Sequence, residues 1–306
     1  MTTQFNPASA EEIQERLIAT QGGLRPGRVA YFLYYLRKKP LGTIGLSICL
    51  LMIFTAIFAP WIAPNTYQEQ NYDAVRVAPN TEFFFGTDQF GRDIFSRVVY
   101  GARISMLVGF LAVIAGTGAG AIIGLMSGYF MGKFDALVQR LVDMWMSFPD
   151  LILALTIVAV FGNTIPNVIL AIAATILPRG VRVIRSSAIT IREMDYTTAA
   201  RAIGATDLRI IFRHVLPNTI APFLIIMSSM FGTAILTEAG LSFLGLGIAE
   251  PTPSWGRMLT GQAAQYMVDS PWILIFPGIA ISVTVLGFAF AGDALRDIFD
   301  PKLRGL

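Results

Sequence analysis

The stretch YTTAARAIGATDLRIIFRHVLPN, residues 196–218, is polar and basic in a chain that is otherwise largely apolar. Its first half places small and apolar residues at i, i+3, i+4 and i+7, the spacing of one stripe along an α-helix. That stripe consists of Tyr196, Ala199, Ala200 and Ile203. Gly204 stands where this helix should stop, and Thr206 and Asp207 favour the start of another.

A second helical stripe follows in the same stretch, with apolar residues again spaced three and four apart. It consists of Leu208, Ile211, Phe212, Val215 and Leu216. Arg209 and Arg213 fall on the opposite side, and Pro217 is expected to end the helix. We name residues 195–217 the polar hairpin. Two short amphipathic helices with narrow apolar faces suit docking into a groove on another protein.

The composition places most of the chain in lipid. Of its 306 residues, 54% are hydrophobic and 14% are charged, and the mean hydropathy is +0.61. Soluble domains carry roughly 25% charged residues. Because a backbone in lipid must satisfy its own hydrogen bonds, long apolar segments predict transmembrane helices. The expected fold class is an all-α polytopic membrane protein.

Six apolar segments approach or exceed the roughly 20 residues that cross a bilayer. They are residues 41–62, 104–131, 144–161, 165–184, 220–244 and 272–290. The second contains a glycine at every fourth position, and such small-xxx-small ridges let helix backbones approach closely. The glycine ridge consists of Gly116, Gly120, Gly124, Gly128 and Gly132. We predict a helix-packing role for it.

The distribution of charge predicts the orientation, because cytoplasmic segments carry most Lys and Arg residues. With a cytoplasmic N-terminus, all but five of the 23 Lys and Arg residues lie on the inner side. No cleavage pattern follows the first apolar run, so we expect it to be retained. The predicted order is a cytoplasmic N-terminal segment (1–40), a first transmembrane helix (41–63), an extracytoplasmic segment (64–103), a five-helix core (104–295) containing the cytoplasmic hairpin, and a cytoplasmic tail (296–306).

The residues offer little catalytic or metal-binding chemistry. Cys49 and His214 are the only cysteine and histidine, which excludes a disulfide framework, a thiolate metal site and a histidine cluster. Gly128, Gly132 and Lys133 resemble a phosphate loop, but three residues separate the glycines where four are required. We therefore expect no catalytic residue, no metal, no cofactor bound by this chain and no nucleic-acid partner. If ATP is used, another chain must bind it.

Two acidic residues fall inside predicted transmembrane helices. Asp150 follows Pro149, and Glu238 lies in GTAILTEAGLSF. An acid at the centre of a membrane helix costs about 2.5–3.5 kcal/mol on insertion scales, so such residues are candidates for a translocation path. The alternative is structural, with each carboxylate capping a broken helix or bonding a neighbouring backbone.

The quoted stretch also has the pattern of a known loop. TAARAIGATDLRIIFRHVLP resembles the EAA loop of bacterial ABC-importer permeases, with an Ala-Ala pair, three residues, Gly, and a Leu-Pro some twelve residues on. Thr198 stands where the family has its name-giving Glu. In that family the loop inserts into a groove of the ATPase subunit, so the resemblance implies an ATPase-docking role for the polar hairpin. The docking residues implied are Tyr196, Ala199, Ala200, Arg201, Ile203, Gly204, Leu216 and Pro217.

Three other stretches narrow the resemblance. FGTDQFGRDIFSRVVYGARIS (85–105), GLSFLGLGIAEPTPSWGRML (240–259) and GDALRDIFDPKLRG (292–305) resemble the second, C-type, permease of dipeptide, oligopeptide and nickel importers. The resemblance implies a type I ABC importer permease fold in the bacterial inner membrane, with both termini cytoplasmic. It also implies a second permease, two ATPase subunits that carry ATP and magnesium, and an extracytoplasmic solute-binding protein.

Three alternatives remain open from the sequence alone. A secondary transporter would usually show repeated halves, whereas the hairpin has no second copy. An intramembrane enzyme would need a catalytic pair that the residues do not provide. A permease of the same fold could also work as an exporter or a homodimer. The solute itself, a peptide or a similar small molecule, is not specified by this chain.

Overall fold

The computed structural model describes residues 40–260, 263 and 265–299. All but the last residue of the predicted N-terminal segment and most of the predicted C-terminal tail lie outside these residues. The described part of the chain is helical, without a named strand. Its main helices are α3 (Pro40–Ile57), α5 (Ile94–Phe130), α6 (Gly132–Met146), α7 (Asp150–Phe161), α8 (Ile165–Arg192), α11 (Leu216–Phe243) and α14 (Trp272–Phe299). The shorter elements are α4 (Ala59–Ile62), η1 (Tyr72–Ala74), α9 (Asp195–Ala202), α10 (Asp207–Ile210), η2 (Ile211–Val215) and α12 (Trp255–Met258).

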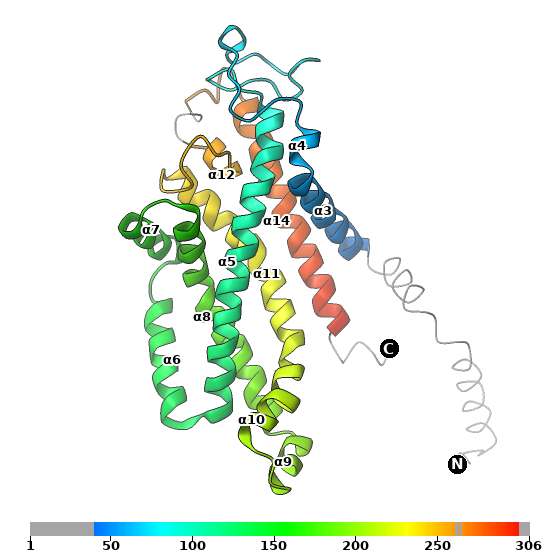
Figure 1. Cartoon of the computed structure of the whole chain (residues 1–306), viewed down its shortest axis with the longest axis vertical. Helices are drawn as coiled ribbons and strands as arrows, with labels where there is room; N and C mark the ends of the chain where they lie inside the picture. The colour runs from blue at the N-terminus through cyan, green and yellow to red at the C-terminus, as the bar shows by residue number, and fades with distance from the viewer. Residues whose placement is uncertain (1–39, 261–262, 264, 300–306) are drawn as a thin grey trace, which may run out of the picture.

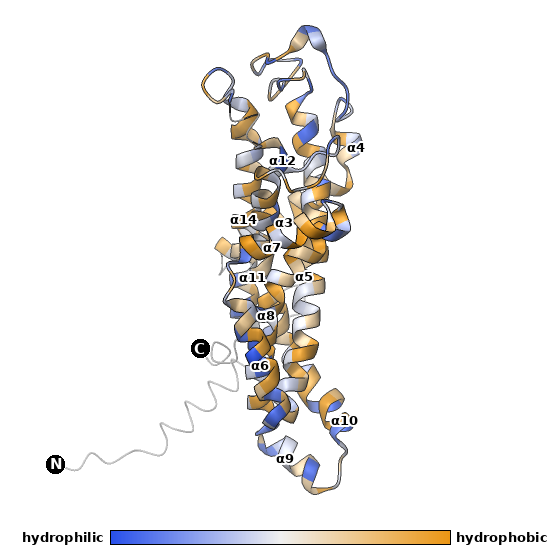
Figure 2. Cartoon of the chain, turned by 90° about the vertical axis from the view of Figure 1, so that its left-hand side faces the viewer, coloured by the Kyte–Doolittle hydropathy of each residue, from blue (hydrophilic) through white to orange (hydrophobic). Residues whose placement is uncertain are grey.

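The helices form an elongated bundle (Figure 1). Helices α5, α8 and α11 are its centre, and α14 and α3 pack along one side. One end carries the loops between α4 and α5 together with α12, and the other carries α9 and α10. Figure 2 shows hydrophobic residues along most of the helices and hydrophilic residues in the loop at the upper end and in α9 at the lower end.

Five described helices are long and apolar enough to cross a membrane, or six if the bent pair α6 and α7 forms one transmembrane segment. The prediction of six transmembrane helices is consistent with this count. The third segment differs from the prediction of a single helix over residues 144–161. It is broken, with an 88° bend between α6 and α7, and α6 already begins at Gly132. Pro149 precedes α7 and favours extended backbone before it, which explains why one helix does not continue through the break.

Helix α5 begins ten residues before the predicted start of its transmembrane segment. Asp93 is its N-cap, and the Asp93 carboxylate accepts hydrogen bonds from the backbone N–H groups of Phe95 and Ser96. This cap satisfies N–H groups that would otherwise lack a partner. The stretch from Ile94 to Arg103, which we predicted as part of a polar loop, is therefore helical.

Pro217 does not end the second helix of the polar hairpin, contrary to the prediction. Residues 207–243 form one continuous helix in which α10 passes through the π-helical turn η2 into α11. Pro217 lies in the first turn of α11. The wider π turn accommodates a residue that lacks an N–H group and would clash with a regular preceding turn. The hairpin is thereby joined rigidly to a membrane helix.

Candidate functional site

The turn of the polar hairpin depends on a glycine. Gly204 has a φ angle of +83°, a conformation that side chains with a Cβ rarely adopt. The Gly204 N–H donates to the Arg201 carbonyl oxygen, and the Ala205 N–H donates to the Ala200 carbonyl oxygen. These two bonds are the Schellman arrangement that ends an α-helix. The sequence prediction of a helix stop at Gly204 is confirmed.

One face of the hairpin packs against its own bundle. Ala200 is only 8% exposed, and Thr197 is fully buried and donates a hydrogen bond to the carbonyl oxygen of Ile191 at the end of α8. The surrounding apolar cluster joins the ends of α5 and α8 to the hairpin. It contains Leu125, Tyr129, Ile184, Ala188, Ile191, Ala200, Ile210, Ile211 and Val215. Tyr129 also donates a 2.6 Å hydrogen bond to Asp207 at the start of α10.

The predicted stripes are therefore each divided between two faces. Ala200, Ile211 and Val215 are buried within the chain and are not available to a partner, which corrects the expectation that whole stripes face outward. The inward face of α9 is formed by Thr197 and Ala200, a rotation of about one residue from the predicted stripe. Small residues lie on both sides of α9, so periodicity alone did not define its buried face.

Three large apolar side chains of the hairpin are exposed, alongside the charged side chains of Arg201, Arg209 and Arg213. Ile203 is 87% exposed, Leu208 67% and Phe212 64%. Tyr196, Ala199, Arg201, Gly204, Leu216 and Pro217 are also exposed at the surface of this end of the chain. Exposed large apolar side chains in an otherwise polar segment are typical of a protein interaction site. The contribution of each residue to docking stays a prediction.

The glycine ridge lies against α8 in parallel register. A Cβ added to Gly120 would lie 2.6 Å from the Leu177 carbonyl oxygen, and one added to Gly128 would lie 2.6 Å from that of Arg185. Gly116 and Gly124 approach the carbonyl groups of Ala173 and Val181 in the same way. Gly132 lies outside this contact, with no atom near its added Cβ.

The two acidic candidates occupy different surroundings. Asp150, at the start of α7, accepts a 2.5 Å hydrogen bond from Arg179 on α8. Glu238 on α11 is 1% exposed and accepts hydrogen bonds from Ser242 at 2.8 Å and Ser105 at 3.4 Å. Ser254, before α12, is a third hydrogen-bond partner of the same carboxylate. These contacts support the structural alternative for Glu238, although a part in the translocation path stays untested.

Glu238 fastens the segment around α12 to the bundle. Ser105 donates to Glu238 and accepts a 3.2 Å hydrogen bond from the backbone N–H of Trp255. The buried Trp255 ring donates to the Val98 carbonyl oxygen at 2.9 Å. Sequence reasoning found the glutamate but missed its serine partners. Ser242 is four residues along the same helix, whereas Ser105 is 133 residues away on α5 and Ser254 lies beyond the end of α11.

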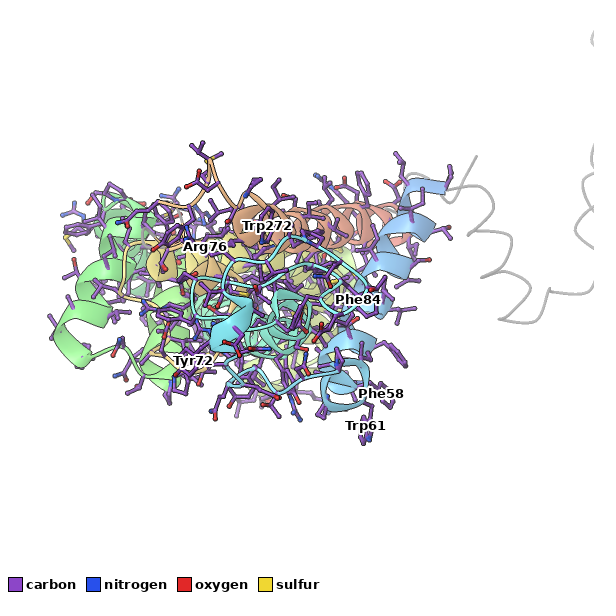
Figure 3. The ribbon with its side chains drawn as sticks, turned by 90° about the horizontal axis from the view of Figure 1, so that it is seen from above. Phe58, Trp61, Tyr72, Arg76, Phe84 and Trp272 are labelled. Carbon is purple, nitrogen blue, oxygen red and sulfur yellow. The ribbon has the colours of Figure 1, made fainter. Side chains whose placement is uncertain are left out.

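The upper loops close the bundle end with a buried ion-pair cluster. The Asp88 carboxylate accepts a 2.7 Å hydrogen bond from the Arg92 side chain and lies 3.8 Å from Arg97, and all three side chains are buried. Trp272 of α14 donates to the Thr87 carbonyl oxygen at 3.2 Å. Seen from above, Phe58 and Trp61 lie at the outer edge, away from these contacts (Figure 3). Exposed aromatic residues beside a membrane helix suit the membrane–water interface.

Within the described residues, no group of three or more His, Cys, Asp or Glu side chains could hold a metal ion. The exposed apolar side chains of the hairpin are the candidate surface for a partner. Polar clusters elsewhere fasten helices to one another.

Comparison with known proteins identifies the family. Residues 120–305 match the family of the binding-protein-dependent transport system inner membrane component, and residues 28–79 match the N-terminal TM domain of oligopeptide transport permease C. The chain belongs to the binding-protein-dependent transport permease family. This permease is therefore a subunit of an ABC transport system, as the sequence resemblance predicted.

Individual relatives cover most of the permease. It is 44% identical over 269 residues to the dipeptide transport system permease protein DppC of Alkalihalophilus pseudofirmus, with 88% of each chain covered. It is 42% identical over 272 residues to the glutathione transport system permease protein GsiD of Escherichia coli, with 88% of this chain and 89% of that protein covered. A crystal structure of an amino acid ABC transporter matches this chain with a TM-score of 0.51 and 19% sequence identity. The match covers 67% of this chain and 95% of the chain in that structure.

These findings confirm the all-α multi-pass permease fold and the predicted role in transport. The solved structure supports the fold, and the relatives support the subunit type. The permease is a non-catalytic component of a multi-subunit transporter, and ATPase activity lies on partner subunits.

Proposed function

We propose that the permease forms half of the translocation pathway of an ATP-driven importer and that its polar hairpin docks on an ATPase subunit. The observation that carries this proposal is the exposed apolar tip formed by Ile203, Leu208 and Phe212. Helix α9 of the hairpin projects from the end of the bundle beyond α6 and α14 (Figure 1). An apolar surface there is satisfied by a protein groove that receives a helix.

The rest of the proposed assembly follows from the family. A second homologous permease completes the pathway, two ABC ATPases bind ATP and magnesium, and an extracytoplasmic binding protein delivers the solute. The permease lies in the bacterial cytoplasmic membrane with both termini in the cytoplasm. The relatives are described as dipeptide and glutathione transport permeases, which favours a peptide or a similar small solute.

The geometry supports a direct route from the ATPase to the membrane helices. Helix α8 enters the hairpin through only two residues, Glu193 and Met194, and the hairpin leaves through a continuous helix into α11. Movement of the docked ATPases would displace both helices together, because the buried cluster around Ala200 holds the hairpin to them. Conformational change in the ATPases is then converted into movement of the pathway.

The test is Leu208→Glu, with Thr198→Glu as the matched control. Leu208 is exposed, so its replacement leaves the bundle intact, but it places a charge in the proposed apolar groove. Full burial of a leucine side chain contributes about 1.5–3 kcal/mol, so we expect ATPase binding to weaken by about tenfold or more. Thr198 is also exposed, and Glu there restores the residue found in the family's loop.

The measurement is the amount of co-expressed ATPase that co-purifies with tagged permease from detergent-solubilised membranes, together with ATP-driven uptake in proteoliposomes. We expect Thr198→Glu to match the unmodified permease in both. Full ATPase recovery and uptake with Leu208→Glu would show that the exposed tip is not the docking surface.

A further inference from the structure

Three arginines on one side of α8 are paired with three aspartates on α6 and α7. The three pairs, which we name the ion-pair ladder, are Arg179–Asp150 at 2.5 Å, Arg182–Asp143 at 2.6 Å and Arg185–Asp135 at 2.6 Å. The arginines are three residues apart, so they lie close to one another along one side of the helix. The ladder therefore connects α8 to both halves of the broken transmembrane segment.

The ladder attaches α6 to α8, and few other side chains of α6 are buried. Among its 15 residues, α6 buries only Asp135 and Val142. Its large apolar side chains are exposed; they are Phe134, Leu137, Leu141, Met144 and Trp145. The Asp135 carboxylate is held by two hydrogen bonds from Arg185, each 2.6 Å long, and by the Ser127 hydroxyl of α5. Such bidentate arginine–carboxylate pairs fix orientation as well as distance.

Helix α8 connects the ladder to the polar hairpin. On its α5 side, the glycine ridge brings the two backbones into contact with no space for a Cβ at Gly120 or Gly128. At the lower end of α8, the hydrogen bond from Thr197 to the Ile191 carbonyl oxygen attaches α9 to α8. A displacement of the hairpin would therefore be transmitted along α8 as a rigid element. The ladder is the contact through which α6 and α7 can follow that displacement.

The exposure of the pairs indicates what the ladder contributes. Arg182 and Asp143 are about half exposed, and ion pairs of that kind contribute only about 0–1 kcal/mol to stability. Charged pairs nevertheless define which residue faces which, whereas an apolar contact tolerates sliding. The Arg182–Asp143 pair therefore suits keeping α6 in register with α8 more than holding the permease folded, whereas the more buried Arg185–Asp135 pair also contributes to stability.

We propose that the ion-pair ladder is a positioning device that makes α6 and α7 move with α8, so that movement of the docked hairpin reaches the bend between them. The ladder transmits displacement and touches no solute. This inference rests on the proposed docking of ATPase subunits at the hairpin. The bend at residues 147–149 is then the point where movement along α6 becomes a change in the direction of α7.

The test is charge reversal at the Arg185–Asp135 pair in the complete transporter. We expect Arg185→Asp and Asp135→Arg each to lower solute uptake by about tenfold, within the range of typical coupling effects. ATPase co-purification and ATP hydrolysis should persist, so the number of solute molecules moved per ATP should fall. The double reversal restores the opposite charges and should recover most of the uptake, as in a double-mutant cycle.

The readouts separate this inference from its alternatives. A purely structural role would lower uptake and hydrolysis in proportion, leaving the transport-to-hydrolysis ratio unchanged. If the single variants fail to accumulate, the same reversals at Arg182 and Asp143 provide the test, since neither side chain is buried. Unchanged ratios in every reversal, or no recovery in an assembled double variant, would overturn the proposal. Failure of the unmodified permease to bind an ATPase would instead contradict the proposed function.

Discussion

The two ends of the bundle differ in which residues they bury and which they expose. At the upper end, Asp88, Arg92 and Arg97 are charged and buried, and each finds its partner within the chain. At the lower end, Ile203 and Leu208 are apolar and exposed, with their surface directed away from the bundle. At the upper end the buried charges are paired within the chain, whereas at the lower end large apolar side chains of the hairpin lie at the surface. The proposed docking of an ATPase uses these exposed side chains of the lower end.

The largest expected effect concerns the buried charges of the upper end. Asp88→Ala would leave Arg92 and Arg97 buried without their shared carboxylate and would remove an acceptor for the backbone N–H of Phe90. Loss of one partner of a buried pair costs about 3–5 kcal/mol. We expect a clear drop in the thermal unfolding temperature of the detergent-purified permease. Asp73→Ala is the control, because Asp73 is exposed on η1.

An unchanged unfolding temperature for Asp88→Ala would mean that the upper end does not depend on its buried charges. The buried charges would then not distinguish the upper end from the lower end in stability.

A smaller effect is expected when two adjacent alanines of the hairpin are each replaced by arginine. Ala200→Arg places a charge in the apolar cluster at the hairpin base, and overpacking alone costs about 1–3 kcal/mol. Ala199→Arg leaves that cluster intact, since Ala199 is exposed. We expect faster proteolysis of the hairpin in Ala200→Arg than in Ala199→Arg, measured in the purified permease without ATPase. Equal proteolysis of the two variants would show that the hairpin is not anchored by its Ala200 face.

The smallest expected effect is that of Glu238→Gln. Gln has the size of Glu, but its NH₂ group is a donor. In the unmodified permease the serine hydroxyls donate to Glu238, so one of them must rotate to accept a hydrogen bond from Gln. The net contribution of one hydrogen bond is about 0.5–1.5 kcal/mol. We expect assembled transporter and solute uptake to decline modestly and in proportion. Normal assembly with uptake abolished would instead place Glu238 in the translocation path.

The sequence was sufficient for the fold class because its signals are local. Apolar segments of membrane length, the glycine spacing and the stop at Gly204 each depend on residues close together in the chain. The predicted stripe was wrong at Ala200 because α9 has only eight residues, with small side chains on both sides. A rotation of one residue about such a helix changes which face is buried, and only tertiary packing determines that rotation.

Features that depend on distant residues escaped the sequence analysis. The ion-pair ladder joins residues 29 to 50 positions apart, and the Glu238 cluster joins α5 to α11. The arginines at 179, 182 and 185 are three residues apart and the aspartates at 135, 143 and 150 are about two helical turns apart, which was the available signal. The bend at Pro149 had to be known before those two sets could be placed opposite each other.

The parallel contact between α5 and α8 has a consequence for how the permease is made. The backbone of Gly128 meets Arg185 and Ala188, and these residues are synthesised only after α6, α7 and most of α8. Until then, the glycine surface of α5 has no native partner in the membrane. During translation, the glycine face of helix α5 therefore remains unpaired in the bilayer until α8 has been inserted. A helix of another chain could occupy that surface first, so biogenesis of this permease has an interval in which premature pairing competes with correct assembly.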